Sequence, residues 1–254
     1  MDSAPGGLLE IHDPVAAFER IEEHMRTAGF FVAAGRGAGG RCADVYLGYG
    51  LAEPLRRADR PARPEPLALP LAACRVRDAA SAAAPPGAYR VGVWERTWPA
   101  VGYAAAVASA REAIAAGEVY QVNLVQHLSA PFEGDPAGVA ATLAPFGPLH
   151  GRPLMGSDWA IVSASPELFL ARRDRRIWTM PIKGTRPRGA AAELRASAKD
   201  AAEHVMIVDL ERNDLGRICE PGSVRWPELM RVRPMAGVEH LVSRVEGTVR
   251  ADVT

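Results

Sequence analysis

The sequence has few cysteines, no net charge and no long apolar run. Its 254 residues include only three cysteines, Cys42, Cys74 and Cys219. Their number is odd, they are widely separated, and no C-x-x-C pair occurs, so neither a disulfide framework nor a zinc site is predicted. We expect reduced thiols, as in a cytoplasmic protein.

The charges of the chain cancel, with 30 basic and 30 acidic residues. A chain without net charge offers no general attraction to nucleic acid or to an anionic membrane, so neither is predicted as a partner. Residues 1–11 lack the basic segment and apolar run of a signal peptide, and no apolar stretch is long enough to cross a bilayer. We therefore expect a soluble, cytoplasmic protein in which local charges hold any anionic ligand.

Prolines and glycines divide the first part of the chain. Residues 54–86 are rich in proline, arginine and alanine, which prevents long regular elements. We predict that residues 1–90 form a short variable region with this linker and that residues 91–254 form the larger domain. Residues 35–40 are rich in glycine but lack the G-K-[ST] sequence of a phosphate-binding loop, which favours a hairpin loop.

Two helices are predicted in the first half of the chain. Residues 13–29 begin with an acid and a proline, and Val15, Phe18 and Ile21 recur with helical spacing. Residues 103–116 carry a second apolar stripe and precede a glycine, which is a common residue at helix ends. We expect both stripes to face a core.

The remaining pattern indicates strands. Residues 119–129 alternate apolar and polar positions, which predicts a half-exposed strand with Gln121 on its polar face. Further strand-like runs occupy residues 159–165, 167–171, 177–180, 223–232 and 240–249. They lack the alternating helices that parallel sheets require, so the pattern favours an α+β fold with antiparallel strands.

Residues 179–217 hold the densest group of reactive side chains. We predict a strand end, a tight turn with Lys183, Gly184 and Thr185, and then a helix. Two acids on that helix, Asp200 and Glu203, are three residues apart and share a face. Spacing alone leaves two interpretations open, namely a reactive site or a helix cap with ordinary surface charges.

Five segments together resemble a known family. They are P-I-K-G-T-R-P-R-G (181–189), K-D-A-A-E-H-V-M-I-V-D-L-E-R-N-D-L-G-R (199–217), G-E-V-Y-Q-V-N-L (117–124), S-A-S-P-E-L-F-L (163–170) and G-V-E-H-L-V-S-R-V-E-G-T-V (237–249). In order and spacing they are similar to the chorismate-utilising enzymes, the family of anthranilate synthase component I and aminodeoxychorismate synthase component I. Five colinear blocks are far more specific than one short motif.

The resemblance implies a fold and a domain arrangement. The family fold is a sandwich of two antiparallel β-sheets flanked by helices, and residues 91–254 would be its chorismate-binding catalytic domain. Family members continue past the position that matches Thr254, so the resemblance implies a C-terminally truncated domain. We expect little or no synthase activity from this chain alone.

The resemblance also implies a site. Glu203 would bind Mg²⁺ directly, with Asp200 as a second carboxylate in or near the metal shell, because Mg²⁺ prefers oxygen ligands. His240 would handle the proton beside the departing group. Gly184 and Thr185 would bind the ring carboxylate of chorismate through the backbone and the hydroxyl.

Two positions distinguish members of the family. Lys183 stands where anthranilate synthases carry a small residue, and in aminodeoxychorismate synthases the uncharged lysine attacks the ring at C2 as the C4 hydroxyl leaves. Gln121 stands where relatives that add water carry a lysine base, which favours ammonia as the incoming group. From the residues alone, Gln121 is equally well an ordinary polar position.

The leading interpretation is therefore aminodeoxychorismate synthase component I. It would convert chorismate and ammonia, the latter from a glutamine amidotransferase subunit, to 4-amino-4-deoxychorismate for 4-aminobenzoate, folate or secondary-metabolite synthesis. Anthranilate synthase component I is the nearest alternative. A non-catalytic remnant that binds chorismate or a partner protein is an alternative of another class.

Overall fold

The computed structural model describes residues 7–31, 40–55, 67–83, 85–235 and 237–253. The chain divides into two compact units, one formed by residues 1–84 with 140–254 and the other by Pro85–Val139. Most of the glycine-rich segment and part of the proline-rich segment lie outside the described residues. The division into residues 1–90 and 91–254 stays a prediction.

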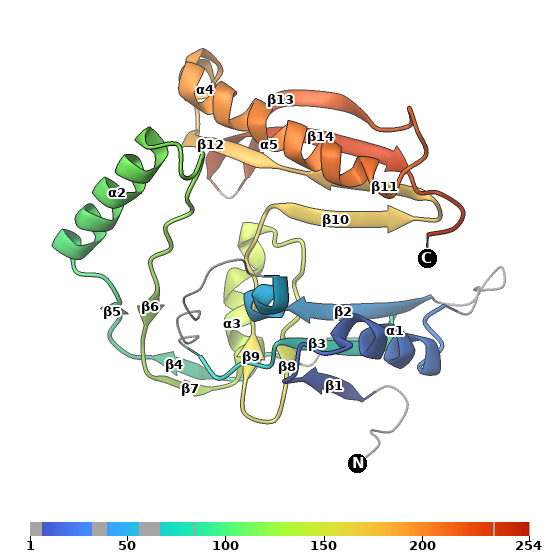
Figure 1. Ribbon diagram of the computed structural model, residues 1–254. Coiled ribbons are helices and arrows are strands. Elements are labelled where there is room, and N and C mark those ends of the chain that lie inside the picture. The colour runs from blue at the N-terminus through green and yellow to red at the C-terminus, as the bar shows by residue number, and fades with distance from the viewer. Residues whose placement is uncertain (1–6, 32–39, 56–66, 84, 236, 254) are drawn as a thin grey trace. The chain divides into compact units, whose positions relative to one another are not determined.

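The first unit contains a three-stranded antiparallel sheet in the order β1-β3-β2 (Figure 1). Its elements are β1 (Leu8–Ile11), α1 (Ala17–Thr27), β2 (Arg41–Leu47), the 3₁₀ helix η1 (Tyr49–Leu55) and β3 (Ala72–Asp78). Helix α1 packs on this sheet and closes a small core around Ile11, Ile21 and Cys74.

Helix α1 confirms the first predicted helix but corrects its inner stripe. Ile21 is buried, whereas Val15 and Phe18 are 72% and 63% exposed. The helix begins at Ala17, so Val15 precedes it, and Ala17 and Ile21 form the buried face at a spacing of four residues. Phe18 therefore points away from the core.

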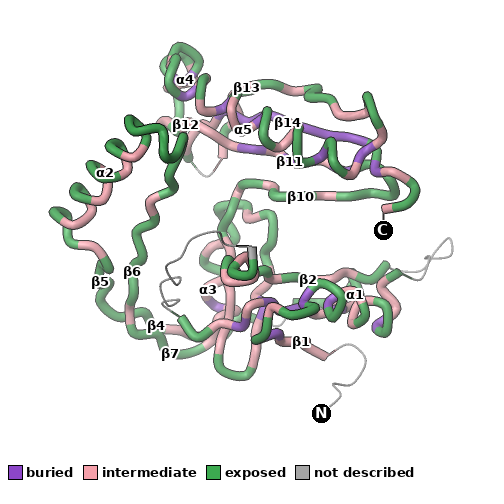
Figure 2. Tube along the Cα trace, viewed as in Figure 1, coloured by how far each residue is buried: buried purple, intermediate pink, exposed green. Residues whose placement is uncertain are grey.

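The second unit is built from two short strand pairs and one helix. Its elements are β4 (Tyr89–Val91), β5 (Glu95–Arg96), α2 (Ala100–Ala115), β6 (Leu128–Ser129) and β7 (Phe132–Gly134), with β4 paired to β7 and β5 to β6. Helix α2 confirms the second predicted helix, but none of its residues is buried, and Figure 2 accordingly colours it green and pink without purple.

The predicted strand over residues 119–129 is wrong for most of its length. Only Leu128–Ser129 pairs with another strand, and residues 119–127 belong to none. Alternating side chains produce a strand only where a neighbour supplies the backbone hydrogen bonds, and no described residue does so for this segment. Gln121 consequently lies exposed on an unpaired stretch of backbone.

The remaining elements of the first unit follow α3 (Pro136–Leu143), which crosses the boundary between the units. They are η2 (Ala144–Phe146), β8 (Leu154–Met155), β9 (Ala160–Ile161), β10 (Leu168–Arg173), β11 (Arg176–Met180), β12 (Ile182–Pro187), α4 (Ala191–Ala196), α5 (Ala198–Gly216), β13 (Arg225–Met235) and β14 (Val238–Thr248). Strands β8 and β9 pair with each other, and β10 to β14 form a five-stranded sheet.

Strand β14 is the centre of the five-stranded sheet. Strand β13 pairs along one of its edges, while β11 and β12 share the other edge, and all pairs are antiparallel. Pro181 separates β11 from β12, and its carbonyl accepts a hydrogen bond of 3.1 Å from the backbone N–H of Ser243. Burial concentrates on β14 (Figure 2). The α+β arrangement with antiparallel sheets is therefore confirmed.

The predicted turn at Lys183, Gly184 and Thr185 is instead a bulge within β12. The pairing of β12 with β14 shifts between Lys183 and Thr185, and Gly184 has a φ of 72°. A single extra residue in one strand, with glycine in the left-handed region, bends the strand without ending it. The residues that suggested a tight turn therefore lie inside a longer strand.

The bulge predicts a specific cost for adding a methyl group. In Gly184→Ala, the Cβ would lie 2.8 Å from Cδ1 of Leu194 and 3.2 Å from Cβ of Asp200, in addition to the positive φ. Gly189→Ala is the matched control, because Gly189 has a φ of 93° and nothing within 4 Å of the new Cβ. We expect each variant to lose about 1–2 kcal/mol from backbone strain, and Gly184→Ala to lose about 1 kcal/mol or more beyond that. Urea unfolding measures the difference, and equal losses would contradict this account of the bulge.

Candidate active site

Helix α5 is held against the sheet at its start and along its inner face. The backbone N–H of Asp200 donates to Oγ of Ser197 at 3.2 Å, which confirms the predicted cap. His204 is fully buried, and its Nε2 lies 2.6 Å from Oγ of Ser243 on β14. Val208 adds an apolar contact further along the helix. These interactions fix which side chains of α5 face the sheet.

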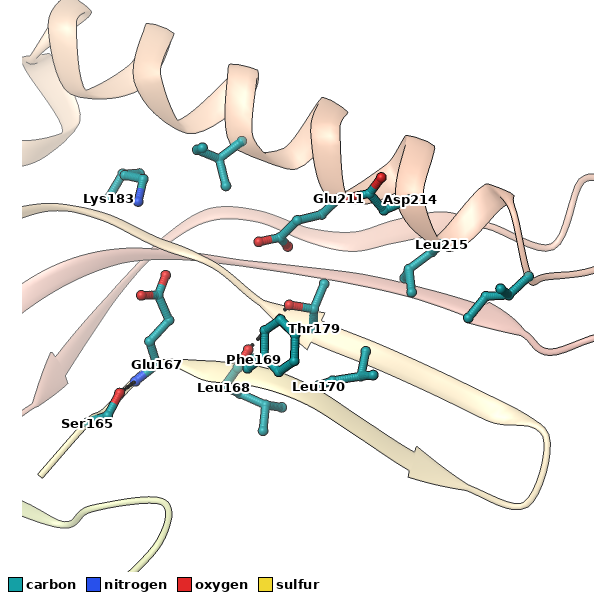
Figure 3. Close-up of a pocket in the computed structure, with 12 residues that line it drawn as sticks. Ser165, Glu167, Leu168, Phe169, Leu170, Thr179, Lys183, Glu211, Asp214 and Leu215 are labelled. Atoms are coloured by element: carbon teal, nitrogen blue, oxygen red, sulfur yellow. Dashed lines mark hydrogen bonds between the residues drawn. The ribbon is translucent and has the colours of Figure 1, made fainter. Parts of the chain in front are cut away.

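A cavity of about 590 Å³ lies between α5 and the sheet (Figure 3). It is lined by residues from the segment before β10 and from β10, β11, β12 and α5, together with one residue that follows α5. They are Ser165, Glu167, Leu168, Phe169, Leu170, Thr179, Lys183, Ile207, Glu211, Asp214, Leu215 and Ile218. The lining therefore combines one amine and three carboxylic acids with an apolar surface.

Lys183 reaches this cavity from β12, and Glu167 approaches it from the start of β10 (Figure 3). Oε1 of Glu167 accepts a hydrogen bond of 2.8 Å from the backbone N–H of Ile182, which orients the carboxylate. Within the described part of the chain, Lys183 forms no ion pair shorter than 4.0 Å. An amine and a carboxylate that line one cavity can exchange a proton through a bound ligand or water.

Glu211 is the most perturbed acid of the cavity. The pKa of its carboxyl group is raised to about 7, mainly by burial and also by the charges of Glu167 and Asp214, while a hydrogen bond with Thr179 and the charge of Lys183 oppose the shift. Its Oε2 atom is enclosed and has no hydrogen-bond partner among the described residues. A proton can therefore be exchanged here near neutral pH.

The pKa of His204 is lowered, first by burial and then by the charge of Lys183. The imidazole is therefore neutral at pH 7. Sequence reasoning missed Glu167 and Glu211 as members of the site and His204 as the buried contact that holds α5. The signals were present, since Glu167 lies in the S-A-S-P-E-L-F-L segment and Glu211 follows Glu203 by eight residues on one helical face.

Three predicted site residues meet beside the bulge. Nδ1 of His240 lies 3.1 Å from Oγ1 of Thr185 and 3.4 Å from the carbonyl oxygen of Gly184. The pairing of Thr185 with His240 across β12 and β14 produces this contact. The group combines the imidazole of His240, the hydroxyl of Thr185 and the backbone of Gly184, which has no side chain to keep a ligand away. These are the groups that the resemblance brings together. Their roles stay predictions.

Lys183 lies on a different face of the sheet. It pairs with Leu241, whereas Thr185 pairs with His240. Paired residues share a face and successive residues alternate, so Lys183 faces α5 and His240 faces the other side. The cavity beneath α5 is accordingly lined by Lys183 and not by His240.

The two predicted metal ligands have separate partners. Oδ2 of Asp200 lies 2.9 Å from the guanidinium of Arg186, and the pKa of Asp200 is lowered, first by its hydrogen bond with Ser197 and also by Arg186. Oε1 of Glu203 lies 3.3 Å from Nζ of Lys199, on a side chain that is 42% exposed. The carboxylate of Asp200 is thus paired with Arg186, while the carboxylate of Glu203 remains accessible to solvent.

No group of three or more His, Cys, Asp or Glu side chains that could hold a metal occurs among the residues described. Mg²⁺ often takes only one or two protein carboxylates and completes its shell with water and substrate oxygens. Glu203 can supply one such ligand. Gln121 lies in the other unit, on Pro85–Val139, and its predicted role is neither supported nor opposed by this geometry.

Comparison with known families identifies the class of protein. Residues 56–254 match the family described as "chorismate binding enzyme". Because this match covers most of the chain, the chain belongs to the chorismate-binding enzyme family. This agrees with the family resemblance of the five sequence segments.

Curated relatives of this chain include enzymes of two kinds. The chain is 38% identical to anthranilate synthase component 1 of Saccharolobus solfataricus over 173 residues, covering 65% of this chain and 41% of that protein. It is 45% identical to aminodeoxychorismate synthase component 1 of Klebsiella aerogenes over 148 residues, covering 53% of this chain and 32% of that protein. The match therefore spans less than half the length of these relatives.

Solved structures support the fold. Anthranilate synthase component I of Streptococcus pneumoniae superposes with a TM-score of 0.68 at 22% identity, covering 88% of this chain and 60% of the other. A putative 2,3-dihydroxybenzoate-specific isochorismate synthase of Bacillus anthracis gives a TM-score of 0.64 at 18% identity, covering 98% and 64%. Among the helices described here, none has both the length and the apolar character needed to span a membrane.

The raised pKa of Glu211 predicts that stability falls as pH increases. The folded state holds this proton up to about pH 7, whereas an ordinary glutamate loses it near 4.5. Between these values the folded state binds more protons, so the free energy of unfolding decreases as pH rises and levels off above the higher value. After allowance for partial solvent access, we expect a loss of about 1–2 kcal/mol.

Urea unfolding at several pH values tests this prediction. Glu211→Gln should remove most of the loss between pH 4.5 and 7. Asp209→Asn, on an exposed carboxylate of the same helix, should retain it. A pH profile that is the same in wild type and Glu211→Gln would show that Glu211 titrates normally.

Proposed function

We propose that this chain carries the chorismate site of an aminodeoxychorismate synthase component I. The observation that carries the proposal is the position of Lys183, which lies in the P-I-K-G-T segment and lines the cavity beneath α5. An anthranilate synthase of this family has a small side chain at that position and could not place an amine in the cavity. Gln121, in place of the lysine of water-adding relatives, also supports an amination.

The proposed chemistry uses groups of this chain in two displacements. Lys183 gives a proton to Glu167, and its free nitrogen forms a bond to C2 of chorismate while the C4–oxygen bond breaks. The hydroxyl would take up a proton and leave as water; the resemblance gives this role to His240, which faces the other side of the sheet from Lys183. Ammonia then bonds to C4 as the bond between C2 and Lys183 breaks, which gives 4-amino-4-deoxychorismate.

Two parts of the site would bind the substrate, namely the bulge in β12 and a Mg²⁺ ion on α5. Gly184 and Thr185 would hold the ring carboxylate, because the bulge leaves Gly184 without a paired residue on β14, next to the Thr185 hydroxyl. Glu203 would bind Mg²⁺ directly, and Asp200, which is paired with Arg186, would lie near the metal without being a direct ligand. When bound, Mg²⁺ would neutralise and orient a substrate carboxylate. Ammonia would come from a glutamine amidotransferase subunit, as the name "component 1" of the relatives suggests.

Trapping the lysine adduct tests the proposal directly. We expect the chain incubated with chorismate and Mg²⁺, without ammonia, to gain the mass of chorismate less one water on Lys183. Lys183→Ala should abolish this species in intact-protein mass spectrometry. Lys199→Ala, whose side chain is 80% exposed on α5, should retain it.

The absence of any adduct on a chain that binds chorismate in calorimetry would favour the non-catalytic remnant. Anthranilate synthase component I is the other candidate, favoured by the names of several relatives. A product assay with ammonia on a chain extended past Thr254 separates the two enzymes, since anthranilate is fluorescent and forms with loss of pyruvate, whereas aminodeoxychorismate retains its enolpyruvyl group.

The proposed metal ligand has its own test. Mg²⁺ should strengthen chorismate binding to the wild-type chain, and Glu203→Gln should weaken this Mg²⁺-dependent gain by about tenfold or more, because a direct ligand contributes at least as much as an outer-shell partner. Asp209→Asn removes a nearby exposed carboxylate on the same helix and should leave the gain intact. Calorimetric titrations with and without Mg²⁺ give the comparison. An equal gain in Glu203→Gln would exclude this residue as the ligand.

A further inference from the structure

The cavity beneath α5 has two chemically different ends. Lys183 lies at one end, and Glu211 and Asp214 lie further along the helix (Figure 3). In all, three carboxylic acids face one amine. Glu167 and Asp214 are exposed to solvent, whereas Glu211 is only partly exposed, so water screens the charge of Glu211 least. Such an environment repels a second anion beside Glu211 and favours a small cation.

The acidic end also contains an unused hydrogen-bond acceptor. Oε2 of Glu211 is enclosed and lacks a partner among the described residues, although the same side chain is hydrogen-bonded with Thr179. A buried acceptor without a donor costs about 1–3 kcal/mol, which a ligand with N–H groups would recover. The site therefore suits a small ion that is both positively charged and a hydrogen-bond donor.

We propose that the Glu211 end of the cavity binds ammonium and takes a proton from it, so that ammonia is produced next to the ring carbon that it attacks. This inference rests on the proposed function. It adds a residue that recognises the nitrogen substrate, and it makes Glu211 a catalytic residue for the step in which ammonia enters.

The proton and electron balance of this step is simple. One N–H bond of ammonium breaks, the proton goes to the Glu211 carboxylate, and the electron pair remains on nitrogen. That pair forms the bond to C4 while the bond between C2 and the nitrogen of Lys183 breaks. The near-neutral pKa of Glu211 allows the carboxyl group to be ionised before the step and protonated after it.

A titration without chorismate tests ammonium binding. Carboxyl carbons of ¹³C-labelled glutamate are followed by NMR against pH in ammonium chloride, and the Glu211 signal is assigned by its loss in Glu211→Gln. A bound cation within hydrogen-bond distance stabilises the ionised form, so we expect ammonium to lower the pKa of Glu211 by about one unit. Potassium chloride and sodium chloride at the same ionic strength should not produce this shift.

Two outcomes would overturn the proposal. An identical Glu211 titration in all three salts would show that ammonium does not bind there. An equal shift with potassium, which has a similar size but no N–H groups, would show a general cation effect. Because neither measurement involves chorismate, failure here leaves the Lys183 adduct experiment unaffected, and failure to form the adduct leaves ammonium binding unaffected.

Discussion

The contact between α5 and β14 determines where every other group of the candidate site lies. The hydrogen bond between buried His204 and Ser243 fixes the rotation of the helix, and the Ser197 cap fixes its start. Together they leave Ile207, Glu211 and Asp214 above the cavity. Removing a buried polar pair of this kind leaves an unsatisfied group, so the helix cannot rotate without a substantial free-energy cost.

The bulge at Gly184 divides the chemistry between the two faces of the sheet. A regular strand would place Lys183 and Thr185 on the same side, because they are two residues apart. The extra residue instead pairs Lys183 with Leu241 and Thr185 with His240. The amine thus enters the cavity with the carboxylates, while the hydroxyl and imidazole meet on the opposite side. A substrate that uses both groups must extend around β12.

Sequence reasoning succeeded where local signals and long-range structure agree. Helices α1 and α2, the cap at Ser197, and strands β13 and β14 follow from apolar periodicity and capping chemistry. It failed where the structure of a segment depends on whether another strand pairs with it. Residues 119–127 alternate like a strand but have no partner among the described residues, and the turn signal at Gly184 lies inside a strand. Glu211 could not be identified as a perturbed acid from sequence, because its pKa depends on burial and on Glu167, a distant residue in the chain.

The central position of β14 has a consequence for how this polypeptide reaches its folded state. Strands β11 and β12 do not pair with each other, and both depend on a strand that is made after them and after α5. During synthesis, the ribosome must release nearly all of this region before its sheet can close. Contacts between residues so far apart in the sequence form slowly. Until they form, the unpaired edges of β11 and β12 are exposed to other chains. A nascent copy of this protein therefore carries unpaired edges on β11 and β12 until β14 has been made.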